Sequence, residues 1–118
     1  MYQTRRTNNQ FSKRDEQDLK NFLPLLVKKY RPKKIILFGS RARGDANEKS
    51  DVDLVIVANL KVRFFKRIGM ILDLYKGKRD LEPLVYTEVE FDKMIKEKRP
   101  FIEKVLKEGI ILYENRYL

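Results

Sequence analysis

Two different apolar periods alternate along this chain, and their alternation constrains the fold more than any other feature. Short runs rich in isoleucine, valine and leucine predict buried strands, whereas longer segments with apolar side chains at helical spacing predict helices. The strand-like runs are residues 35–38, 51–57 and 81–86, with 110–113 as a last strand or extended tail. The helix-like segments are residues 12–30, 62–75 and, as two helices divided before Pro100, 87–108. This order predicts an α/β (α+β) fold, in which helices pack on a small mixed sheet.

Several residues mark where these elements should begin, end or bend. Pro24 lies inside the first helical segment, so we expect that helix to kink or restart there. Pro83 lies inside a strand-like run, which favours an edge position or a bulge. Thr87 and Glu90 have the spacing of a capping box that opens a helix, and Gly77 is placed to end the preceding one.

The length and hydropathy pattern predict a single domain. At 118 residues, the chain can bury one adequate core, which we assign to residues 12–118. Residues 1–11 carry Arg5 and Arg6 without an apolar period, and we expect a flexible basic arm there. No apolar run approaches the roughly 20 residues that span a bilayer, so we expect a soluble, cytoplasmic protein that has no membrane partner.

The composition limits the chemistry of any site. The sequence contains no cysteine and no histidine, which excludes disulfides, thiolate ligands and the commonest general base. A metal ion would have to be bound by oxygen, which suits Mg²⁺, Mn²⁺ or Ca²⁺. The net charge of +10 favours phosphate-bearing partners such as nucleotides or RNA, although solubility and salt-bridged helix faces would explain it equally well.

A glycine-bounded turn follows the first strand-like run. Gly39 and Ser40 open it, Arg41 and Arg43 add positive charge, and Gly44 closes it. Such a turn lets the backbone approach an anion and can open one short helix. It resembles the first half of a P-loop, but the Lys-Ser/Thr ending is missing. On its own, the motif would fit an ordinary turn with surface arginines equally well.

Two acidic residues interrupt the second strand-like run. Asp51 and Asp53 follow Ser50 and, being two residues apart, should project from one face of a strand. Their like charges would repel unless a proton or a divalent cation joined them. Surface aspartates at a strand start are the alternative, but the rest of the run is apolar, and buried acids need a partner.

A third acidic pair precedes or opens the third strand-like run. Asp80 and Glu82 also share a face by strand parity. Either could complete a three-carboxylate site, and either could equally be a solvated acid beside Lys78 and Arg79.

The spacing of these motifs resembles the signature of the nucleotidyltransferase (DNA polymerase beta-like) superfamily. The form GSRARG … SDVDL is most similar to the minimal nucleotidyltransferases (MNT) of archaea and bacteria, and the resemblance covers about residues 33–113. It implies that Gly39 and Ser40 contact a nucleoside triphosphate and that Asp51 and Asp53 bind metal ions. It places Glu82 where the family usually has aspartate for its third carboxylate, and Asp80 remains the alternative.

The resemblance also implies a reaction. We expect transfer of a nucleotidyl group, from ATP or another NTP and with two Mg²⁺ ions, to a hydroxyl of a HEPN-type partner protein in a toxin–antitoxin pair. The alternatives are an acceptor that is RNA or a small molecule, and a module that neutralises its partner by binding alone. An open edge strand could also pair two copies into a homodimer. The residues predicted to be catalytic and metal-binding are Asp51, Asp53 and Glu82. Those predicted to bind the nucleotide are Gly39, Ser40, Arg41, Arg43 and Ser50.

Overall fold

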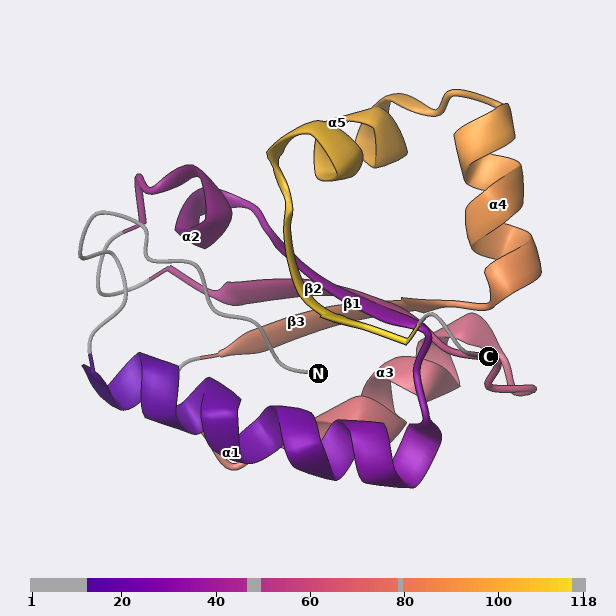
Figure 1. Cartoon of the computed structure of the whole chain (residues 1–118). Coiled ribbons are helices and arrows are strands. Elements are labelled where there is room, and N and C mark those ends of the chain that lie inside the picture. Colours follow the sequence, from indigo (N-terminus) through magenta and orange to yellow (C-terminus); the bar gives the residue numbers. More distant parts are fainter. Residues whose placement is uncertain (1–12, 47–49, 79, 116–118) are drawn as a thin grey trace.

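The computed structural model describes residues 13–46, 50–78 and 80–115, and Figure 1 shows the elements they form. The helices are α1 Lys13–Tyr30, α2 Ser40–Arg43, α3 Phe64–Leu72, α4 Glu88–Lys96 and α5 Pro100–Glu108. The strands are β1 Lys34–Phe38, β2 Val52–Val57, β3 Leu81–Tyr86 and β4 Ile110–Glu114. The predicted basic arm, residues 1–11, lies outside the described residues. Within the described ranges, no helix is both long enough and apolar enough to cross a membrane.

The strands form one mixed sheet, as the sequence predicts. Their order is β3-β2-β1-β4. β1 runs antiparallel to both β2 and β4, whereas β2 and β3 are parallel. Pro83 therefore lies in an edge strand, where its missing N–H is tolerated, and the predicted edge position is confirmed.

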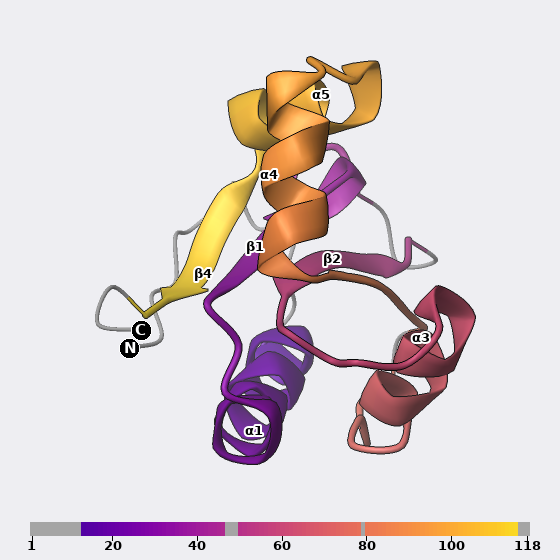
Figure 2. The ribbon, with the colours of Figure 1, turned by 90° about the vertical axis from the view of Figure 1, so that its right-hand side faces the viewer.

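Helices cover both faces of this sheet (Figures 1 and 2). α1 and α3 lie on one face, and α4 and α5 lie on the other. Side chains alternate accordingly along β2: Val52, Leu54 and Ile56 belong to the core under α1, as predicted, while Val55 and Val57 belong to the core under α4 and α5. The sheet is thus buried on both sides except where polar residues occupy its end.

Two predicted helix boundaries differ from the structure. α1 continues through Pro24 as one helix, so the expected restart there is wrong. α3 ends at Leu72, with Asp73 at its C-cap, and not at Gly77. The apolar stripe continues past the helix end because Tyr75 still packs on α1: its ring meets the Phe22 ring edge-on, with centroids 5.3 Å apart. The apolar pattern therefore extends beyond the last residue of the helix, and it predicted a helix that is too long.

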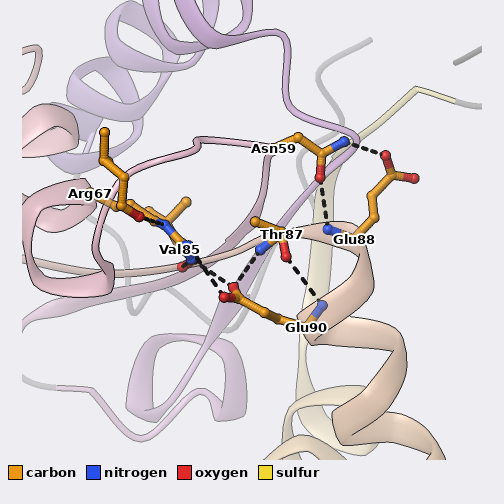
Figure 3. A network of polar contacts seen from close by, with 7 residues as sticks. Asn59, Arg67, Val85, Thr87, Glu88 and Glu90 are labelled. Atoms are coloured by element: carbon orange, nitrogen blue, oxygen red, sulfur yellow. Dashed lines mark hydrogen bonds and ion pairs between the residues drawn. The ribbon is translucent and has the colours of Figure 1, made fainter.

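The start of α4 is held by the predicted capping box, which also binds a buried arginine (Figure 3). Thr87 Oγ1 accepts from the Glu90 amide, and Glu90 Oε1 accepts from the Thr87 amide, at 3.2 and 2.8 Å. The nearly buried Arg67 guanidinium donates to Glu90 Oε1 at 2.6 Å and to the Val85 carbonyl at 3.1 Å. This hydrogen bond from Arg67 is the largest cause lowering the pKa of Glu90 below its ordinary value. The Arg67 guanidinium thus connects α3 to both β3 and α4.

We predict that Glu90→Gln destabilises the protein by about 1–2 kcal/mol at pH 7, because Arg67 then keeps a buried charge without its counterion. The folded-state pKa of Glu90 is lowered, so the stabilisation is complete above about pH 4.5 and is lost as the pH falls through the folded value. Urea unfolding of both proteins at pH 7 and pH 3 measures the difference, which should shrink in acid. Glu97→Gln, which alters an exposed ion pair on the same helix, is the control and should change little. A Glu90→Gln loss that is unchanged at pH 3 would contradict the ion-pair explanation.

Candidate active site

Strand register brings four of the predicted site residues, Gly39, Asp51, Asp53 and Glu82, to one end of the sheet. Asp53 in β2 lies opposite Phe38 at the end of β1 and, on its other side, opposite Glu82 in β3. Gly39 follows Phe38 directly, and Asp51 precedes β2 by one residue. Directly paired residues share a face of the sheet, so Asp53 and Glu82 project on the face covered by α4 and α5. Two motifs separated in sequence thus meet at a single position.

Gly39 cannot be replaced by a residue with a side chain without disturbing this end of the sheet. Its φ angle of +75° lies in the left-handed region that favours glycine. A Cβ added at this position would also overlap Oδ2 of Asp53. The absence of a side chain therefore lets the Asp53 carboxylate lie directly against the Gly39-Ser40 turn.

The Glu82 carboxyl contacts both aspartates, and the charge of Asp51 acts on Asp53. Glu82 is hydrogen-bonded to Asp53 and to Asp51, and the bond to Asp53 is the largest cause raising the pKa of Glu82 to about 6. Burial is the largest cause raising the pKa of Asp53, with the nearby charge of Asp51 acting in the same direction. The guanidinium groups of Arg43 and Arg41 act in the opposite direction on Asp53. The cluster therefore holds a proton more firmly than isolated acids would.

Such a cluster has the donors that a hard divalent cation requires. All of its donors are carboxylate oxygens, and the charge repulsion that favours a proton favours a divalent cation more strongly. Across the described parts of the chain, no three acidic side chains already surround one ion position. The residues fit a cation that would offset their like charges and draw Asp51, Asp53 and Glu82 around it.

Asp80, the alternative to Glu82, lies differently. It precedes β3, its side chain is exposed, and its carbonyl accepts the Val52 amide at 2.8 Å. Its backbone thus extends the β2–β3 ladder, whereas Glu82 supplies the carboxylate that contacts Asp53. This arrangement supports Glu82 as the third carboxylate.

The two arginines of the turn lie in contrasting environments. Arg41 is completely buried, and its Nη2 donates to the carbonyl of Ser50 at 2.9 Å, which ties the turn to the segment that leads into β2. Arg43 is half-exposed and forms ion pairs with Asp45 at 3.3 Å and with Glu108 of α5 at 3.6 Å. Nucleotide binding by either residue stays a prediction, and the contacts of Arg41 favour a role in positioning the acidic segment.

Sequence reasoning missed one part of this region. A cavity of about 170 Å³ lies beside Gly39, between β1, α2 and α5, and Phe101 and Lys104 of α5 contribute to its wall. Nothing in the sequence connects these two residues with Gly39, because α5 begins 61 residues later and only the folded chain brings it back to this end of the sheet.

Residues 20–117 match the family model described as polymerase beta, nucleotidyltransferase. The chain belongs to this nucleotidyltransferase family. The predicted family is thereby confirmed, and the chain is a nucleotidyltransferase whose mixed α/β fold carries the carboxylates and the Gly39-Ser40 turn at one end.

Two relatives of this nucleotidyltransferase come from Methanocaldococcus jannaschii and carry provisional names as protein adenylyltransferases. One is 40% identical over 101 residues, which cover 84% of this chain and 98% of the relative. The other is 43% identical over 67 residues, which cover 51% of this chain and 46% of that relative.

Two solved structures share the fold. One is assigned as a nucleotidyltransferase of Sulfolobus solfataricus, with a TM-score of 0.61 and 22% identity over 86% of this chain and 81% of its own. The other is described as a toxin–antitoxin with AMP-PNP, with a TM-score of 0.52 and 17% identity over 82% of this chain and 74% of its own. Both likenesses concern the fold alone.

We predict that Glu82→Gln raises the melting temperature by about 2–5 °C at pH 7 in the absence of divalent cations, because it removes one like charge from the cluster. A raised folded-state pKa means that the wild type loses stability as the pH rises from about 4.5 to about 6. The advantage of the variant should therefore vanish below pH 4.5. Thermal melts with and without Mg²⁺ measure it, and Mg²⁺ should stabilise the wild type more than the variant. Asp80→Asn is the matched control, and an equal stabilisation by it would refute the assignment of Glu82.

Proposed function

We propose that this nucleotidyltransferase transfers AMP from ATP, with Mg²⁺, to a hydroxyl group of a partner protein. The observation that carries the proposal is the contact of Glu82 with Asp51 and Asp53, with the Asp53 carboxylate directly against the Gly39-Ser40 turn. An acidic cluster for cations beside a glycine turn for phosphates is the combination that nucleotidyl transfer requires.

Each group of residues would have a distinct role. Asp51, Asp53 and Glu82 would hold two Mg²⁺ ions, which supply charge neutralisation at the triphosphate when bound. The Gly39-Ser40 turn would hold the outer phosphates, with Arg43 beside it. The acceptor oxygen forms a bond to the α-phosphorus, the bond from the α-phosphorus to the bridging oxygen breaks, and pyrophosphate leaves. The hydroxyl proton passes to solvent.

An acceptor on another protein is supported by the openness of the site. Glu82 is exposed on the edge strand β3, so the β3 side of the cluster is accessible to an incoming group. The described helices cover the two faces of the sheet, whereas Glu82 lies on its edge strand. The acceptor's own surface would therefore complete the site.

The comparisons support the same acceptor class. The M. jannaschii relatives are named for protein adenylyltransfer, and one fold neighbour is a toxin–antitoxin with AMP-PNP. From the motif resemblance, we propose a HEPN-type protein as the partner and an antitoxin role for this chain.

RNA is the second candidate acceptor. The net charge of +10 supports it, because a strongly basic surface attracts polyanions. A labelling experiment separates the two: the protein is incubated with Mg²⁺, ATP labelled at the α-phosphate, and either the protein encoded by the neighbouring gene or a pool of RNA. We expect label on the protein, stable to ribonuclease. Label on RNA alone would select the second candidate. Neutralisation of the neighbour without label would select binding without catalysis.

We predict that Asp53→Asn lowers the rate of transfer by at least about 100-fold while the protein stays folded, because a carboxylate central to the cluster is lost. Glu82→Gln should also impair transfer strongly. Asp80→Asn, an acidic residue nearby that does not contact the cluster, should retain nearly full activity. Initial rates and circular dichroism of the three variants measure these effects. Near-normal rates for both Asp53→Asn and Glu82→Gln would place the chemistry elsewhere.

A further inference from the structure

A cavity beside the Gly39-Ser40 turn is lined partly by aromatic rings, although the chain is highly charged. It measures about 170 Å³ and lies on the α4/α5 side of the sheet. Its walls include the rings of Phe38 and Phe101, which meet edge-on with centroids 5.5 Å apart at 85°. Lys104 and Glu108 contribute polar groups. Flat apolar walls with charged groups beside them suit a flat molecule that has polar edges.

The cavity is continuous with the site described above. Gly39 lines the cavity and also lies against the Asp53 carboxylate. Phe38 lines it and pairs with Asp53 across the β1–β2 ladder. Arg43 lines it too, and its charge acts on Asp53. A ligand held at the turn and the carboxylates would therefore have this cavity as its immediate neighbour.

The position of the cavity assigns it to the donor and not to the acceptor. β1 lies on one side of β2, and β3 with the exposed Glu82 lies on the other. The cavity is on the β1 side, and the β3 side is open. The two substrates can thus approach Asp53 from opposite sides.

The cavity is small. Its volume of about 170 Å³ is below the roughly 300 Å³ at which pockets for whole drug-sized ligands begin, so it suits one ring system of a ligand whose remainder lies outside it. Phe101 is partly exposed and can offer its ring face to it.

We propose that this cavity binds the purine base of the nucleoside triphosphate, with Phe101 as the stacking wall and with Lys104 and Glu108 at the polar edges of the base. Lys104 can donate to a ring nitrogen, and Glu108 can accept from an exocyclic amine. The inference rests on the proposed function, since it assumes that the triphosphate occupies the Gly39-Ser40 turn.

The test separates the base from the phosphates. Calorimetry compares AMP-PNP with tripolyphosphate, both with Mg²⁺, on the wild type and on Phe101→Ala. Loss of a stacking ring should weaken AMP-PNP about 5- to 100-fold and leave tripolyphosphate unchanged. Leu106→Ala is the matched control, because Leu106 is similarly exposed on α5 but does not line the cavity. Equal affinities of Phe101→Ala and Leu106→Ala for AMP-PNP would overturn the proposal.

A second measurement keeps an aromatic side chain at position 101. The sequence contains no tryptophan, so Phe101→Trp and Leu106→Trp each introduce a single fluorescent reporter. AMP-PNP should quench the reporter at position 101 but not the one at 106, and tripolyphosphate should quench neither. Purine triphosphates should also bind more tightly than pyrimidine triphosphates, and equal affinities would overturn the assignment.

The outcomes distinguish this inference from the proposed function. If neither AMP-PNP nor tripolyphosphate binds the wild type, the proposed function fails. If both bind but Phe101→Ala changes only the KM for the acceptor, the cavity belongs to the acceptor, and only the inference fails.

Discussion

The register of β2 against its two neighbours is the constraint on which the rest of this molecule depends. It fixes Asp53 opposite Phe38 on one side and opposite Glu82 on the other. A shift of one residue in either ladder would turn the paired side chain to the opposite face, into the core under α1. Both faces of β2 are buried and apolar beyond Asp53, so such a shift would bury a carboxylate among apolar side chains, and the cost of burying an unpaired charge therefore enforces the geometry of the site.

The cluster of Asp51, Asp53 and Glu82 destabilises the folded state electrostatically, because its like charges lie close together. Contact with the aspartates raises the pKa of Glu82, and burial together with the charge of Asp51 raises that of Asp53, which is unfavourable at neutral pH without a counterion. Two features make it tolerable: the positive charges of Arg41 and Arg43 act on Asp53, and Gly39 leaves room for its carboxylate. Elsewhere in the protein an acidic group stabilises the fold: Glu90 is ion-paired with Arg67, and this pairing lowers the pKa of Glu90. A concentrated negative charge of this sort is expected where a cation binds.

Features that depend on local sequence patterns could be predicted, whereas features that depend on contacts between distant segments could not. Alternation in β2 and the Thr87 capping box are local, and both were confirmed. The choice between Asp80 and Glu82 could not be made, because strand parity gives the face of a residue but not its partner across the sheet. Arg41 resembled a surface charge at a turn, yet it is buried against the segment that contains Ser50. The cavity under α5 was missed entirely, because its walls come from two segments far apart in the sequence, residues 38–43 and 101–108.

Calorimetric titration of AMP-PNP, with Mg²⁺ and with EDTA, tests most directly the central claim that the carboxylate cluster and the glycine turn form one nucleotide site. The account predicts measurable binding only when Mg²⁺ is present. It also predicts that Asp53→Asn removes most of this dependence on the metal, whereas Asp80→Asn preserves it. Binding of equal strength in EDTA, or a dependence on Mg²⁺ that survives Asp53→Asn unchanged, would contradict the account.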